Sequence, residues 1–131
     1  MTAPNIVNVA SLYGKTTYFT PSGTSAVVLL ANPANSNKVL KINQIVASNI
    51  DGTNQVDASV AIYTNGGQSQ GSAPSGGSAF AIASTISVPA DATLIIVDKS
   101  TSFYLEEDKS ISITSGTASK LTFMVSYEEI S

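Results

Sequence analysis

The chain has 131 residues, enough for one domain with its own hydrophobic core and too few for two comfortable ones. Its net charge is −3, and six scattered lysines do not form the cationic patch that a nucleic-acid binder needs. Only 11% of the residues are charged and 43% are hydrophobic, while Ser and Thr make up about a quarter of the chain. This composition favours sheet over helix and excludes nucleic acid as an expected partner.

Apolar segments recur about every ten residues from the N-terminus, a spacing typical of sandwiches and barrels. Ile6, Val7 and Val9 predict a first short strand or an extended arm within residues 1–12. Three further strands are predicted at 15–20, 25–31 and 38–48. Turn residues follow each of them, so the chain is expected to fold back on itself repeatedly.

Residues 56–63 show the cleanest alternation in the sequence. Val56, Ala58, Val60 and Ile62 share one face, which we expect to be buried. The next segment, 64–79, breaks the pattern: it holds five of the nine glycines and no residue able to anchor a core. It is therefore predicted to be a long, flexible loop.

The last third of the chain returns to short apolar segments, which end in polar corners. The predicted strands cover 80–88, 93–97, 103–105, 111–113 and 121–127. The run TLIIV at 93–97 would aggregate on an open edge, so we place it centrally, covered on both faces. Nine or ten short strands suit two packed sheets, and the fold prediction is a single-domain, all-β antiparallel β-sandwich, jelly-roll-like, over 1–131.

The reactive residues that most enzymes use are missing from this sequence. His and Cys are both absent, which removes the commonest general base, most zinc sites and the common nucleophile triads. No S-x-x-K or G-x-S-x-G motif occurs, and the Gly66-Gly67 and Gly76-Gly77 pairs lack the lysine and helix of a phosphate loop. A Ser–Lys pair could still meet in space, but we expect no enzyme and no cofactor.

Acidic residues suggest two candidate sites, a catalytic carboxylate pair and a calcium site. Glu106-Glu107-Asp108 and Glu128-Glu129 resemble a carboxylate pair, but neighbours on a strand point to opposite faces, so we interpret both as solvated corners. The spacing of Asp51, Asn54 and Asp57 matches an EF-hand loop poorly. We therefore assign Asp51 to a turn and Asp57 to an exposed face.

Carbohydrate binding is the strongest rival among binding roles, because β-sandwiches often carry sugars on aromatic platforms. The sequence has no Trp. Phe80, Phe103, Phe123 and Tyr127 fit inward positions, whereas Tyr13, Tyr18, Tyr63 and Tyr104 fit outward ones. An exposed Tyr on a strand more often covers an edge or contacts a protein than a sugar.

The N-terminus, MTAPNIVNVASLYGK, has neither the basic start nor the apolar block of a signal peptide. No apolar stretch approaches the ~20 residues of a membrane span. Neither export by that route nor membrane insertion is expected.

The strand phrasing from residue 38 onward resembles small virion structural proteins of tailed bacteriophages, most closely those of phages that infect cyanobacteria. The similar segments are KVLKINQIVASNIDGTNQVDASVAIY, STISVPADATLIIVDKSTSFYLEEDKSISITS and LTFMVSYEEIS. This resemblance implies a non-enzymatic component of the particle, made in the host cytoplasm, whose partners are other virion proteins. It fits a decoration or cement protein on the capsid, or a neck, tail or fibre-attachment protein. The oligomeric state stays open, and analogy with other decoration proteins suggests a homotrimer.

Two regions are candidates for contact with such partners. The 64–79 loop is long enough to lie across a neighbouring surface, and the arm could add a strand to a partner. An ordinary loop and an ordinary first strand are the alternatives for each. The candidate contact residues are Ile6, Val7, Val9, Asn65, Gly66, Gly67, Gln68, Ser72 and Pro74.

Overall fold

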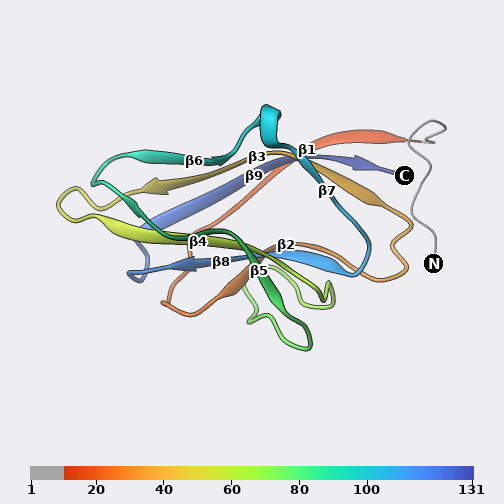
Figure 1. Cartoon of the computed structure of the whole chain (residues 1–131), viewed down its shortest axis with the longest axis horizontal. Coiled ribbons are helices and arrows are strands. Elements are labelled where there is room, and N and C mark those ends of the chain that lie inside the picture. Colours follow the sequence, from red (N-terminus) through yellow and green to blue (C-terminus); the bar gives the residue numbers. More distant parts are fainter. Residues whose placement is uncertain (1–10) are drawn as a thin grey trace.

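The computed structural model describes residues 11–131, which form two antiparallel sheets packed face to face (Figure 1). Within these residues there are nine strands and one short 3-10 helix, η1 (Lys99–Thr101). The strands are β1 (Leu12–Phe19), β2 (Val27–Asn32), β3 (Val39–Asn49), β4 (Val56–Tyr63), β5 (Ala79–Val88), β6 (Thr93–Val97), β7 (Phe103–Leu105), β8 (Lys109–Ser115) and β9 (Leu121–Ile130). The predicted β-sandwich is confirmed.

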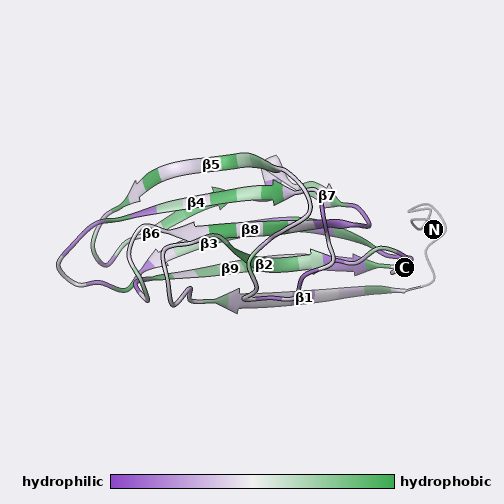
Figure 2. Ribbon diagram, turned by 90° about the horizontal axis from the view of Figure 1, so that it is seen from below, coloured by the Kyte–Doolittle hydropathy of each residue, from purple (hydrophilic) through white to green (hydrophobic). Residues whose placement is uncertain are grey.

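The strand order identifies the sandwich as a jelly roll. Sheet A has the order β1-β9-β3-β6, with β7 also paired to β3, and sheet B has the order β2-β8-β4-β5. The pairs β1–β9, β2–β8, β3–β6/β7 and β4–β5 are nested, so the chain resembles one long hairpin rolled into two sheets. Figure 2 shows β5, β4, β8 and β2 side by side across sheet B.

The core lies between the two sheets and is built from the alternating positions. Val56, Ala58 and Val60 are buried as predicted, and Ile62 is half-buried. Phe123 is the largest fully buried side chain, on the inner face of β9. These residues place one face of each sheet in the core and leave the other face to solvent or loops.

The central placement of TLIIV is wrong. β6 is an edge strand of sheet A with β3 as its strand neighbour, and Ile95 is 58% exposed on the outer face. Leu94 and Ile96 pack against the core from the edge. β6 can stand at an edge because it has only five residues and a register shift against β3, and both features make further strand pairing less favourable.

The inward position predicted for Phe80 on β5 does not bury it. Phe80 is 62% exposed, and Ile86 on the same strand is exposed as well. The pairing of β5 with β4 shifts register twice, near Val60, but Phe80 is still paired with Ile62 and Ile86 with Ala58, on the core side of β4. Both side chains are exposed because β5 is the edge strand of sheet B.

Candidate interaction surface around the 64–79 loop

The 64–79 loop begins and ends in a hydrogen-bonded neck between β4 and β5. The Thr64 amide donates to the Ser78 carbonyl at 3.1 Å, and the Ser78 amide donates to the Thr64 hydroxyl at 2.8 Å. The Tyr63 hydroxyl donates to the Gly77 carbonyl and accepts from the Gly77 amide, both at 3.0 Å. The loop consequently buries Tyr63, so the exposure predicted for this side chain is wrong.

The first turn of the loop is held against the ends of β2 and β8. The Gly66 amide donates to Asp108 at 3.2 Å, and the Ser110 hydroxyl donates to the Asn65 carbonyl at 2.9 Å. A Cβ at Gly66 would stand 2.9 Å from the main-chain N and O of Lys109, and would also meet the Asn32 carbonyl. Only glycine fits this approach of backbone to backbone.

The middle of the loop closes the side of the sandwich where β1 and β2 lie. The Val28 amide donates to the Ser72 carbonyl at 2.9 Å, and the Gly71 amide donates to the Val28 carbonyl at 2.8 Å. Gln70 donates to the Thr17 hydroxyl on β1 and to the Leu29 carbonyl on β2, both at 3.0 Å. One side chain thus bridges the edges of the two sheets.

The candidate contact residues of the loop differ in their accessibility. Gly67 and Ser72 are exposed, Asn65, Gln68 and Pro74 are half-buried, and Gly66 is buried under the loop. The candidates Ile6, Val7 and Val9 lie outside the described residues. Contacts to β1, β2 and β8 fix the path of the loop, while its flexibility stays a prediction.

Two adjoining hollows lie beneath this loop and beside β2. The first, of about 370 Å³, is lined by Gly66 to Gln70, by Leu29 to Ala31 and by Tyr127. The second, of about 230 Å³, shares Leu30, Ala31, Pro33 and Tyr127 with it. Within the described residues, the buried Gln68 Oε1 has no hydrogen-bond partner.

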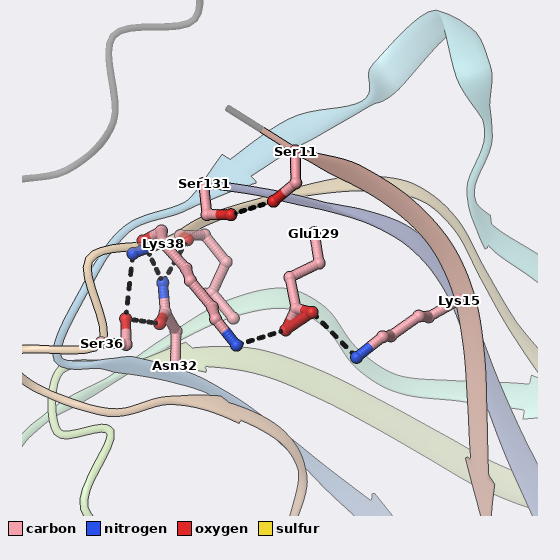
Figure 3. Close-up of polar contacts among 8 residues, drawn as sticks. Ser11, Lys15, Asn32, Ser36, Lys38, Glu129 and Ser131 are labelled. Carbon is pink, nitrogen blue, oxygen red and sulfur yellow. Dashed lines mark hydrogen bonds and ion pairs between the residues drawn. The ribbon is translucent and has the colours of Figure 1, made fainter. Parts of the chain in front are cut away.

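Glu129 of β9 lies at the rim of the second hollow, between two lysines (Figure 3). Its carboxylate accepts from Lys15 at 2.8 Å and from Lys38 at 3.0 Å. The hydrogen bond from Lys15 is the main cause that lowers the pKa of Glu129 and raises the pKa of Lys15. Burial raises the pKa of the neighbouring Tyr127 hydroxyl. The cluster joins β1, β9 and the residue before β3 electrostatically.

Buried asparagines fix the two ends of the sandwich, and sequence analysis did not single them out. Asn32 donates to the carbonyls of Lys38 and Leu105, both at 3.0 Å, and accepts from Ser36 (Figure 3). Asn49 donates to the carbonyls of Asn54, Val88 and Pro89 and accepts from the Asp51 amide. The signal available in the sequence was an Asn at the end of an apolar run, just before a turn.

The acidic corners are only partly as predicted. Glu107 and Asp108 do form a turn, but Glu107 is buried and accepts from the Asn37 amide at 3.0 Å. Glu128 and Glu129 lie within β9, not in a turn. The solvated interpretation was wrong for Glu107 and Glu129, because a main-chain amide and two lysines provide them with hydrogen bonds, whereas Glu106 is exposed as predicted.

Asp51 serves a turn, as predicted. Its carboxylate accepts from the amides of Thr53 and Asn54, and these bonds lower its pKa. Asp57 is exposed on β4, also as predicted. Among residues 11–131, no group of three or more acidic, His or Cys side chains is arranged to hold a metal ion.

Comparison with known proteins yields no relative: no protein-family model matches the chain, and no curated protein matches it. Within the described part of the chain, no helix has the length and apolar character to cross a membrane.

Tyr13, Tyr18 and Tyr104 are exposed, as expected. Tyr18 and Tyr104 lie on the outer face of sheet A, where they are paired with Met124 and Lys41, whereas Tyr13 is paired with Glu129 on the opposite face of β1. Tyr18 and Tyr104 therefore mark a candidate contact surface that is separate from the loop surface.

Proposed function

We propose that this chain is a non-enzymatic structural protein of a phage particle, which decorates or cements the capsid surface. The resemblance in strand phrasing supports this proposal, and the segment from residue 38 onward corresponds to β3 through β9. Jelly rolls occur in viral structural proteins, although a fold on its own does not define a function.

The observation that carries the proposal is the construction of the 64–79 loop. Its neck, first turn and middle are tied to β1, β2, β4 and β8, while Ser72, Ala73 and Ser75 are exposed. A surface loop whose anchors are hydrogen-bonded and whose tip is free can meet a neighbour with little loss of conformational entropy. Five of its sixteen residues carry a hydroxyl group and three carry an amide side chain, which suits a wet interface.

The carboxylates of Glu107, Asp108 and Glu129 also favour a structural role. Each is engaged by a main-chain amide or a lysine that helps to hold the fold. These three carboxylates, which could act as acids or bases in an enzyme, thus stabilise the fold instead.

The experiment is quantitative mass spectrometry of purified particles that contain this chain, with a tip variant as a probe of the contact. Ala73→Arg is expected to lower the copy number per particle, because Ala73 is exposed at the tip. Ser22→Arg, at an exposed turn remote from the loop tip in sequence, is the matched control and should leave the copy number unchanged. Equal copy numbers of the two variants would show that the loop tip does not contact a neighbouring protein.

A neck, tail or fibre-attachment role is the alternative position within the particle. A density map of the intact particle separates the two, because a decoration protein lies on the capsid lattice and a neck or tail protein lies on the particle axis.

Carbohydrate binding is a second candidate function, favoured by one observation. The hollow beside β2 combines the half-buried ring of Tyr127 with the unpartnered Gln68 Oε1, which could accept a hydrogen bond from a sugar hydroxyl. A glycan array with the wild type, Gln68→Ala and Tyr127→Ala tests it. Retention of a glycan by the wild type and its loss in both variants would favour this role over the structural one.

A further inference from the structure

Exposed apolar side chains form a continuous row across the outer face of sheet A. Tyr18 on β1 is paired with Met124 on β9, Met124 with Val46 on β3, and Val46 with Ile95 on β6. Tyr18 is 66% exposed, Ile95 58% and Met124 40%. We call these four residues the apolar row. Residues paired across a ladder share one face of the sheet, so the row crosses the full width of sheet A on its solvent side.

Hydroxyl and amide side chains border the apolar row on both sides. On one side the Thr20 and Thr122 hydroxyls are 2.8 Å apart, and those of Ser48 and Thr93 are 3.2 Å apart. On the other side Thr16 and Ser126 are 3.2 Å apart. The paired positions are Thr20, Thr122, Ser48 and Thr93 in one row, and Thr16, Ser126 and Gln44 in the other. The three rows form an uncharged band, which is four strands wide in two rows and three strands wide in the third, where Asp98 and Lys99 border it.

The next row along the strands carries two opposite charges. Lys41 on β3 is paired with Glu128 on β9. Within residues 11–131 neither residue takes part in an ion pair, in contrast with Glu129, which binds two lysines. A positive charge on β3 and a negative charge on β9 thus stand on either side of the line between these two strands.

We propose that a second copy of this chain docks on this face, about a two-fold axis that runs along the strands between β3 and β9. Such an axis places each β9 over the β3 of the other copy and each β1 over the other β6. Met124 then faces Val46 of the second copy, and Tyr18 faces Ile95. The same axis sets Lys41 of each copy opposite Glu128 of the other. Apolar side chains then face apolar side chains, and opposite charges face one another.

The size of the face approaches that of a specific contact. Strands about 4.8 Å apart and rows about 6.8 Å apart give a flat area on the order of 500 Å² for four strands and four rows. Side-chain relief adds to this flat area, and specific interfaces bury about 600 to 1,000 Å² per partner. The uncharged band brings no like charges together, although each copy has a net charge of −3.

The short helix η1 rises above this face beside Gln44 and Ser126 (Figure 1), where it borders a hollow of about 650 Å³. Because η1 follows β6, the proposed axis places it over β1 of the second copy, near Gly14. A Cβ at Gly14 would meet no atom within 4 Å, so the surface there is open. The two copies can therefore approach without obstruction at this level.

Sedimentation velocity over a concentration series tests the interface, with a matched pair of variants. Ile95→Lys should weaken dimer formation at least about tenfold, because it places a charge in the apolar row of both copies. Phe80→Lys is the control, since Phe80 is 62% exposed but lies on β5 of the other sheet. Thermal unfolding of both variants shows whether each is folded.

The proposal is overturned if the wild type sediments as a monomer at all concentrations or as a trimer, or if the two variants dimerise equally. It concerns association of free copies and holds for either position in the particle, so its failure leaves the proposed virion role intact.

A charge exchange tests the axis itself. Lys41→Glu and Glu128→Lys should each weaken the dimer, because each places like charges opposite one another. The double exchange restores opposite charges and should recover dimerisation. A double variant no better than the single ones would exclude the proposed orientation.

Discussion

Gly66 in the loop lies directly against the carbonyl oxygen of Asn32 at the end of β2, with no room for a side chain between them. This contact joins the loop to the corner where Asn32 also bonds to Lys38 and Leu105. The loop and the end of the sandwich are therefore one packed unit, and a change at position 66 should affect both.

Gly66→Ala should lower the free energy of unfolding by about 2 kcal/mol, because the added methyl group meets backbone atoms that cannot move aside cheaply. Gly23→Ala is the control, since a Cβ at Gly23 would meet no atom within 4 Å. Urea unfolding of both variants measures the difference. Equal stability of the two variants would contradict the close approach at Gly66.

Asn49→Ala should destabilise the chain by about 3 kcal/mol, because it removes donors from the Val88 and Asn54 carbonyls and an acceptor from the Asp51 amide. Asn43→Ala, at the half-buried register shift of β3, is the matched control and should cost much less. Thermal unfolding compares them. A loss below about 1 kcal/mol at Asn49 would show that water replaces its hydrogen bonds.

Glu129 makes the free energy of unfolding depend on pH. Its pKa is lowered from the ordinary value of 4.5, chiefly by the hydrogen bond from Lys15, so the folded chain binds fewer protons than the unfolded chain just below that pH. The stabilising contribution is complete above pH 4.5 and is lost as the pH falls through the lowered pKa. Asp51 and Asp98 act in the same direction.

Glu129→Gln should therefore reduce the loss of stability between neutral pH and about pH 3, while Asp51 and Asp98 maintain part of it. Urea unfolding at a series of pH values measures the slope for wild type and variant. An unchanged slope would show that Glu129 has the same pKa in the folded and unfolded chains.

Amide hydrogen exchange tests whether the 64–79 loop is ordered. The Gly71 amide donates to the Val28 carbonyl, and the Val28 amide donates to the Ser72 carbonyl. Both amides should therefore exchange slowly. The Ala73 amide, at the exposed tip, should exchange quickly. Fast exchange at Gly71 as well would favour the flexible loop that its glycine content predicts.

Much of this fold follows from the sequence, because a period of two locates Val56–Tyr63 and a short apolar run locates Thr93–Val97, both with the bounds that the structure has. The failures lie at sheet edges. Ile95 and Phe80 are apolar but exposed, because the local pattern of a strand does not tell which strand becomes an edge. A register shift in β6 also alters which of its side chains turn inward.

The candidate surfaces were less predictable than the fold. Gln70 bridges β1 and β2 across more than forty residues of sequence, and Glu129 meets Lys15 and Lys38 only after the strands pair. The glycine content of the loop predicted a flexible backbone. In the structure, Gly66 instead lies close to the backbone of Asn32 and Lys109, and Gly71 lies close to the ring of Phe19. The composition of residues 64–79 indicated a loop, but it did not indicate the two hollows beneath that loop.

The most direct test of the proposed role is a cryo-electron-microscopy map of purified particles that contain this chain, with its copy number measured by mass spectrometry. The proposal predicts jelly-roll density at a fixed number of sites on the particle, with the 64–79 loop against a neighbouring protein. Absence of the chain from purified particles, or a copy number that varies between preparations, would contradict it.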